Sequence, residues 1–170
     1  MSNNRRCPNV HFRKRFDHDA RHLVNKHPGE PGVREKCAAV YLRGHWTIDK
    51  DALRFIDFKE SEIRKMVCPA CRQIKNGEPR GFVYLEGDFV AGYREEIKNL
   101  LRSEARRAMA TNPLARIMGW KVAEERLILT TTTDHLAQHL GRSLKRTYRG
   151  EVRYSFSHKN KFARVCWKGD

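Results

Sequence analysis

The sequence lacks three features that would point to common functions. No apolar run approaches the length of a membrane-spanning helix, so the chain is not expected to contact a membrane. Neither GxxxxGKS/T nor GxGxxG occurs, which removes the usual phosphate-binding loops of nucleotide-dependent enzymes. No paired carboxylates, and no nucleophile with an identifiable base, stand out. The sequence therefore predicts a protein that is not an enzyme, with no small-molecule substrate evident.

Acidic residues are also scarce relative to basic ones. The 170 residues include 35 Lys and Arg against 20 Asp and Glu, which gives a formal net charge of +15. The excess is concentrated in residues 1–36 and 80–170. Such an excess favours a polyanionic partner, because counterions released from a phosphate backbone drive binding. A nucleic acid is therefore preferred over the alternative of a merely well-hydrated surface.

Cysteine is present in an odd number and without a secretory signal. The chain starts Met-Ser-Asn-Asn-Arg-Arg, which leads into charge and not into an apolar signal region. Five cysteines in this context predict reduced thiols in a cytoplasm rather than a disulfide framework. We therefore expect a cytoplasmic protein.

Composition divides the chain into three parts. Residues 1–33 mix basic residues, Asn, Pro and Gly with few apolar anchors, and they predict a flexible basic arm that contains Arg13, Lys14 and Arg15. Residues 34–79 predict a small module with a strand and a return around Gly44. A module of this size buries too little surface to be stable alone, so it needs a covalent or metal link.

Residues 80–170 predict a regular α/β unit. The apolar pattern alternates between period two and a helical period, and a threonine run at 130–133 offers a cap for the second helix. The order is β-α-β-β-α-β plus one added strand, which is typical of the split β-α-β arrangement of ferredoxin-like domains. The expected segments are strand 81–86, helix 94–110, strands 116–122 and 126–130, a helix that ends near 150, and a hairpin of 152–157 and 162–167.

Cys68-Pro69-Ala70-Cys71, with Cys37 upstream, predicts a metal site. Two thiols three positions apart can present both sulfurs to one ion, and tetrahedral zinc prefers thiolates. A closed structural site needs four ligands, so one is missing from this set. The alternative is that Cys37 is a buried core thiol and the turn holds no metal. The favoured fourth ligand is His45, and the next candidates are Cys7 and His27.

Two other cysteine roles are less favoured: Cys166 as a metal ligand, and the CxxC motif as a redox pair. Cys166 lies inside the final expected strand and is more simply a small strand residue. A thioredoxin-type redox role requires the CxxC motif to open a helix, whereas residues 72–79 predict a loop.

The expected second helix carries a basic stripe. After Asp134 no acidic residue occurs until Glu151, whereas an ordinary solvated helix would intersperse acids. Leucines on another face should pack on the sheet, and the basic residues should face phosphates. If the two helices lie side by side, the first helix continues this surface with Lys98, Arg102 and Arg106. The stripe on the second helix consists of His135, His139, Arg142, Lys145, Arg146 and Arg149.

The strand aromatics do not predict a base-stacking platform. Phe82, Tyr84, Tyr154 and Phe156 lie at period two, so we expect them to face the helices as core rather than to face RNA.

Four motifs, in this order, resemble a bacterial family of small, mostly uncharacterised zinc-ribbon proteins: Cys37-Ala-Ala-Val-Tyr-Leu-Arg-Gly-His-Trp46, Cys68-Pro-Ala-Cys71, Gly81-Phe-Val-Tyr-Leu-Glu-Gly-Asp88 and Leu129-Thr-Thr-Thr-Thr-Asp-His-Leu-Ala137. The resemblance covers about residues 30–168. The cysteine-rich part of that family is distantly similar to the ribbon of the Nmd-type adaptor, which binds the large ribosomal subunit. Family members have two facing CxxC knuckles, but Arg34 stands here in place of the first cysteine. The resemblance implies one structural zinc and association with ribosomes or RNA.

Together these features predict an α+β protein, with a zinc-ribbon-like module followed by a ferredoxin-like domain. The expected function is binding of structured RNA, in particular rRNA on a ribosomal particle, through the arginine-rich helix surfaces and the basic arm. The alternatives are a DNA-binding or regulatory protein, an RNA-processing enzyme, and a protein-binding module.

Overall fold

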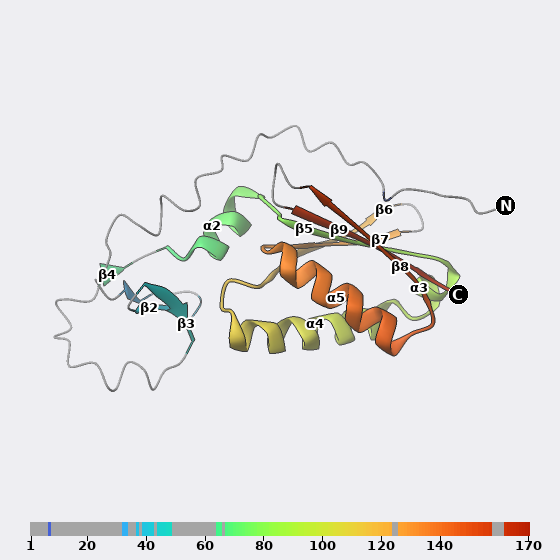
Figure 1. The fold of residues 1–170 in the computed structure, drawn as a ribbon, viewed down its shortest axis with the longest axis horizontal. Coiled ribbons are helices and arrows are strands. Elements are labelled where there is room, and N and C mark those ends of the chain that lie inside the picture. The colour runs from blue at the N-terminus through green and yellow to red at the C-terminus, as the bar shows by residue number, and fades with distance from the viewer. Residues whose placement is uncertain are drawn as a thin grey trace.

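The computed structural model describes residues 7, 32–33, 37, 39–42, 44–48, 64–65, 67–123, 126–157 and 162–170. The predicted basic arm, with Arg13, Lys14 and Arg15, therefore lies almost wholly outside the described residues. Figure 1 shows a small sheet at one end of the molecule and a larger sheet covered by helices at the other. Among the described residues no helix combines the length and the apolar character needed to cross a membrane.

The small sheet has four short strands in the order β3-β2-β1-β4. The hairpin of β2 and β3 turns at Gly44, whose φ of 88° is readily adopted by glycine. The prediction of a strand and return around Gly44 is therefore confirmed. The strands are β1 (Gly32–Val33), β2 (Val40–Leu42), β3 (His45–Thr47) and β4 (Arg64–Lys65).

Helix α2 (Pro69–Asn76) follows directly from the cysteine motif, so the predicted loop at residues 72–79 is wrong. Pro69 suits the first helical position because that position needs no intrahelical N–H donor. Gly77, at a φ of 66°, ends the helix in the left-handed conformation, and Glu78 N donates to Gln73 O at 2.9 Å. In the sequence Pro69 and Gly77 suggest turns, but in the structure Pro69 begins a short helix and Gly77 ends it.

The larger sheet has five strands in the order β6-β7-β5-β9-β8. The first part is a split unit, because β7 lies between β5 and β6 and is antiparallel to both. The added strand β9 is parallel to β5 and separates it from β8. The strands are β5 (Gly81–Glu86), β6 (Ile117–Ala123), β7 (Arg126–Thr131), β8 (Gly150–Ser157) and β9 (Phe162–Gly169).

Three helices accompany this sheet: α3 (Asp88–Gly92), α4 (Arg94–Thr111) and α5 (Asp134–Thr147). Helices α4 and α5 lie side by side on one face of the sheet (Figure 1). As predicted, Thr133 caps α5, and its Oγ1 accepts from Leu136 N at 3.2 Å. The expected order of strands and helices is thus confirmed. The strand order within the sheet is a finding of the structure alone.

The main core lies between the sheet and these two helices. The contributing side chains follow the predicted periods, with alternate strand residues meeting leucines spaced along α5. Each such side chain contributes about 1.5–3 kcal/mol when fully buried. The largest members are Leu85, Leu127, Leu129, Trp167, Ile97, Leu101, Leu136, Leu140 and Leu144.

The prediction that the four strand aromatics face the helices as core is wrong. Tyr154 and Phe156 are 37% and 50% exposed. Phe82 and Tyr84 do not face the helices. Their neighbours Val83 and Leu85 belong to the core, so Phe82 and Tyr84 lie on the opposite face of β5. Both are nevertheless buried, at 5% and 1% exposure. Period two in an all-apolar strand does not distinguish the two faces, because either alternate set can meet the helices.

Candidate functional site

Cys37, Cys68 and Cys71 come together as the spacing predicted. Cys37 precedes β2, Cys68 is the N-cap of α2, and Cys71 lies in its first turn. Their sulfur atoms all lie within 4.8 Å of one another. Sulfurs around tetrahedral zinc are separated by about 3.8 Å, since each Zn–S bond is about 2.3 Å. A small contraction would bring these three thiols into a zinc coordination sphere, so the donor set fits the ion.

The cluster rests on a small core of its own. Cys68, Ala39 and Ala70 are fully buried, and Trp46 packs against them. Leu114, from the connection between α4 and β6, also packs there. The three thiols therefore lie where the small module meets the larger unit.

Arg116 reaches the cluster from the larger unit. Its Nη1 donates to Cys71 Sγ at 3.6 Å, and its Nε donates to Pro113 O at 2.9 Å. Thr132 holds the Arg116 backbone, because its Oγ1 accepts from Arg116 N at 2.8 Å. A fixed guanidinium beside the thiols favours thiolate over thiol.

This environment shifts the pKa values of Cys37 and Cys68 in opposite directions. Burial acts to raise the pKa of Cys37, but a hydrogen bond with the Ala39 backbone and the Arg116 guanidinium outweigh it and lower the pKa to about 7. Burial raises the pKa of Cys68 to about 11, and the neighbouring sulfurs add to this rise. A cation bound among the three sulfurs would favour the charged form of all of them.

The fourth ligand has no counterpart among the described residues. His45 lies exposed in β3 and is not one of the side chains that converge with the three sulfurs. His27 lies outside the described residues. Cys7 forms a disulfide with Cys166, so in this structure it is not free to bind metal.

That disulfide corrects the prediction that all five cysteines are reduced and that Cys166 is only a small strand residue. Cys166 is in β9 opposite Arg153 of β8, and Cys7 Sγ lies 3.9 Å from Arg153 O. The two cysteines are 159 positions apart, so only the folded structure brings them together.

Helix α2 also removes the argument used against a redox role, because Cys68-Pro-Ala-Cys71 does open a helix. The environment of Cys68 gives a different argument. A redox-active thiol in this motif is normally exposed with a low pKa, whereas Cys68 is fully buried and its pKa is raised to about 11.

The basic stripe lies on α5 where the pattern placed it, except for Arg149, which follows the end of the helix at Thr147. Leu136, Leu140 and Leu144 are at most 2% exposed, so the leucine face is buried against the sheet. The opposite surface is solvent-exposed and basic. His139 lies at its border and is partly buried, while the exposed members are His135, Arg142, Lys145, Arg146 and Arg149.

An acid does reach this stripe, from the neighbouring helix. Glu104 of α4 is 4% exposed, and its Oε2 lies 2.9 Å from His139 Nε2 and accepts from Ser143 Oγ at 3.3 Å. Its Oε1 lies 2.8 Å from Arg107 Nη1 and 3.7 Å from Arg146 Nη2. A search for acids along α5 alone does not find this residue, because the carboxylate approaches from α4.

Glu104 is held in its charged form. Burial acts to raise the pKa of this carboxyl, but hydrogen bonds from His139 and Ser143 and the charge of Arg107 lower it below the ordinary value. The carboxylate therefore fixes the side of the basic stripe nearest α4, and Arg142, Lys145 and Arg149 are not among its partners.

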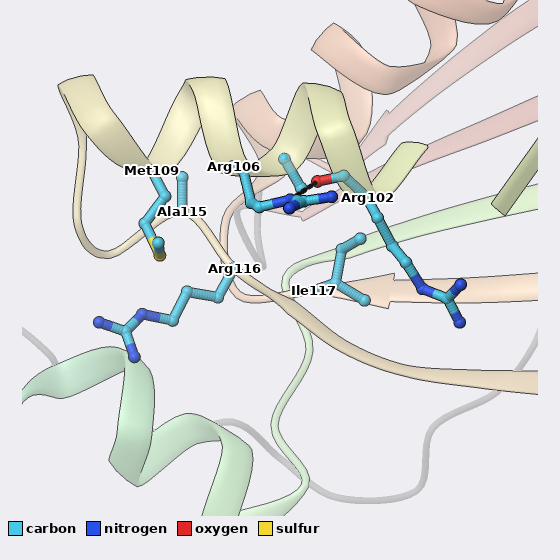
Figure 2. Close-up of a pocket in the computed structure, with 7 residues that line it drawn as sticks. Arg102, Arg106, Met109, Ala115, Arg116 and Ile117 are labelled. Carbon is cyan, nitrogen blue, oxygen red and sulfur yellow. Dashed lines mark hydrogen bonds between the residues drawn. The ribbon is translucent and has the colours of Figure 1, made fainter. Parts of the chain in front are cut away.

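The basic residues of α4 do not all continue the α5 surface. Lys98 Nζ pairs with Glu95 Oε1 at 2.6 Å, and the Arg102 guanidinium lies 5.8 Å from the centre of the Trp120 ring. Arg102 and Arg106 face the connection to β6 (Figure 2). Glu104, by contrast, faces α5, where it meets His139. The two helices are side by side as predicted, but they present two separate basic surfaces.

Between α4 and the segment entering β6 the surface is hollowed, with a cavity volume of about 380 Å³ (Figure 2). Its walls combine three arginines with small and apolar side chains. The motifs in the sequence do not indicate this site, because its residues come from a helix and from the segment that follows its stop. The lining residues are Arg102, Ala105, Arg106, Met109, Ala115, Arg116 and Ile117.

Comparison of the chain with protein-family models, with curated proteins and with solved structures found no match. The resemblance to zinc-ribbon proteins therefore stays a prediction from the motifs.

Proposed function

We propose that this protein binds structured RNA, and in particular rRNA on a ribosomal particle, through the exposed face of α5. The observation that carries the proposal is a helix with one face buried in the core and the other exposing Arg142, Lys145 and Arg146, with Arg149 just beyond its end. A helix packed so completely is a rigid support for its charges. Arg142 and Arg146 lie four residues apart, about 6 Å along the axis, so both can contact one phosphate backbone.

Glu104 limits which side chains of this surface are available to bind phosphates. It draws His139 and Arg146 towards α4, and so leaves Arg142, Lys145 and Arg149 as the side chains with most freedom to approach phosphates. Arginine suits this role, since its planar guanidinium bonds two phosphate oxygens at once.

We further propose that the three thiols hold one structural zinc ion. Cys37, Cys68 and Cys71 would supply three ligands, and the fourth would come from a residue outside this cluster; His45 would have to move to reach it, since it does not converge with the sulfurs in this structure. When bound, the ion would link the segment before β2 to α2. The protein's own contribution is Arg116, which holds Cys71 by a hydrogen bond.

The ferredoxin-like topology of the larger unit and the cytoplasmic location of the protein are also proposals. The split arrangement of β5, α4, β6 and β7 supports a ferredoxin-like origin for the larger unit, with β9 as an inserted strand. The three thiols at the metal site must stay reduced to bind an ion, which favours a cytoplasmic location, whereas the Cys7–Cys166 disulfide favours an oxidising one.

Binding of a labelled RNA hairpin, measured over a range of salt concentrations, tests the RNA proposal. Replacing Arg142, Arg146 and Arg149 with glutamine should keep the fold, because the leucine face is untouched. Affinity should fall, and the log–log salt slope should shrink by about one for each phosphate that the variant no longer neutralises. Lys98→Gln on α4 is the control.

Two outcomes would contradict the proposal. A triple variant with wild-type affinity and slope would remove α5 from the binding surface. Equal competition by duplex DNA at matched salt would remove the preference for RNA. Co-sedimentation with ribosomal subunits from a lysate tests the ribosomal partner, and a protein that stays entirely in the supernatant would exclude it.

A further inference from the structure

We propose that the hollow beside α4 binds one unpaired nucleotide, with its phosphate against Arg106 and its base against the apolar wall. The inference rests on the proposed RNA binding and adds a second subsite to it, on the side of α4 away from α5. It also assigns a role to Arg116, Met109 and Ile117, which the basic stripe does not use.

Charge is the first reason. Three of the seven lining residues are arginines, and no carboxyl group lines the hollow in the part of the chain that the structure describes. Arg106 lies across the hollow, and its Nε donates to Arg102 O at 3.5 Å (Figure 2). Its two terminal nitrogens thus remain able to donate to an anion.

Arg116 contributes a fixed positive charge to the lining of the hollow. Its Nη1 and Nε donate to Cys71 Sγ and Pro113 O, which hold its guanidinium towards α2 and away from Arg106 (Figure 2). The phosphate is therefore assigned to Arg106, and Arg116 adds to the positive potential of the hollow.

The wall of the hollow defines the rest of the ligand. Ala105, Met109, Ala115 and Ile117 offer apolar surface and no hydrogen-bonding side chain. A methionine thioether packs well against aromatic rings. An inorganic anion would leave this wall unused, whereas a nucleotide carries both a phosphate and a flat ring.

Size and position agree with this ligand. A volume of about 380 Å³ is at the small end of the range for ligand pockets, about 300–1,000 Å³. Arg102, which also lines the hollow, lies over the Trp120 ring, so the positive charge extends along α4. Arginines in a row with a ring-binding wall are typical of sites for single-stranded nucleic acid. A paired base could not enter, because its edges and faces are already occupied in the duplex.

The test uses the full chain and two kinds of probe. The first is adenosine 5′-monophosphate, with adenosine and inorganic phosphate as separate arms, followed through NMR signals of the methyl groups of Met109, Ala115 and Ile117. We expect saturable shifts with the monophosphate, at least about tenfold weaker binding of either half alone, and a similar loss in Arg106→Gln. Arg106 is exposed, so this variant should keep the wild-type amide spectrum; Arg142→Gln is the matched control.

The second probe is a pair of RNA hairpins that differ by one bulged nucleotide. Wild-type protein should prefer the bulged hairpin by about tenfold. Arg106→Gln should lose that preference while keeping its affinity for the fully paired hairpin, and Arg142→Gln should do the reverse.

The outcomes separate the two proposals. Binding of both hairpins with equal affinity, together with no methyl shifts, would overturn the nucleotide site and leave the α5 surface standing. Binding of neither hairpin would overturn the RNA proposal, and the monophosphate titration would then decide on the hollow alone. Shifts that persist in Arg106→Gln, or that inorganic phosphate reproduces in full, would also overturn the inference.

Discussion

Glu104 links two helices. It belongs to α4, and its carboxylate contacts His139 and Ser143 of α5. Its carboxylate is almost fully buried and has a pKa below the ordinary value. A group whose pKa is lower in the folded state stabilises the fold above its unfolded pKa. That contribution is lost as the pH falls through the folded value.

We therefore expect the free energy of unfolding to decrease as the pH falls below about 4.3, the ordinary pKa of glutamate. Glu104→Gln should make this decrease less steep, and at pH 7 it should cost about 1–3 kcal/mol because it removes charge-assisted hydrogen bonds. Urea unfolding at a series of pH values measures both effects. Glu96→Gln, on the exposed side of α4, is the control. Parallel pH curves for Glu104→Gln and the wild type would contradict the prediction.

At the same scale, individual residues show where prediction from the sequence reaches its limit. Cys37, Cys68 and Cys71 could be predicted as a group, because CxxC spacing is local and a small module needs a link. The contacts of Glu104 and Arg116 could not, because each crosses between elements that only tertiary packing brings together. No periodicity within one element contains that information.

Among the elements, α2 and its N-cap carry two of the three proposed metal ligands. Protein purified with zinc and a reductant should contain about one zinc per chain, and Cys71→Ser should lose most of it, since a site with two thiols binds the ion weakly. Elemental analysis measures the ratio, and thermal unfolding with a chelator measures the stabilisation. Cys7→Ser is the control, because Cys7 is outside the cluster. A metal-free wild type that is fully folded would contradict the site.

Helix α5 lies close to the sheet at Gly141. A Cβ atom there would lie 2.5 Å from Val165 Cγ1 and 3.2 Å from Tyr154 Cε1. Alanine is the better helix former by about 1 kcal/mol, but overpacking typically costs about 1–3 kcal/mol, so we expect Gly141→Ala to lower the free energy of unfolding. Chemical denaturation measures it. Gly92→Ala in α3 meets nothing within 4 Å and should be neutral or slightly stabilising. A stabilised Gly141→Ala would mean that α5 can move away from the sheet.

The regular elements from β5 to β9 could be predicted because each has a long, clean period. For helix α4, for example, the pattern predicts residues 94–110 and the structure has Arg94–Thr111. Helix α2 could not be predicted, because eight residues give too little periodicity to outweigh Pro69 and Gly77 as turn signals. The place of β9 was also beyond prediction, since a terminal hairpin can join a sheet by either of its strands.

For the whole molecule, the Cys7–Cys166 disulfide closes a loop over most of the chain, since its cysteines are 159 positions apart. Closing so long a loop should stabilise the folded state by restricting the unfolded chain, by about 2–4 kcal/mol in typical cases. Under oxidising conditions Cys7→Ser should lower the free energy of unfolding by a similar amount, and under reducing conditions it should match the wild type.

Peptide mapping without reductant provides the direct check on this bond. A linked pair of peptides that contain Cys7 and Cys166 is expected after mild oxidation. Two free thiols at these positions, with equal stability of Cys7→Ser and the wild type, would contradict the pairing.

The position of β9 between β5 and β8 has a consequence for synthesis of the chain. Strand β5 emerges from the ribosome first, but its parallel neighbour consists of residues 162–169, and β8 pairs with that same neighbour. Until those residues emerge, at about 5–20 residues per second, β5 has one unpaired edge and β8 lacks the strand that it pairs with in the described sheet. Pairing across so long a sequence separation is slow to nucleate. We therefore expect this unit to close only after residue 169 is free, and a nascent chain to expose an apolar strand edge that chaperones must shield.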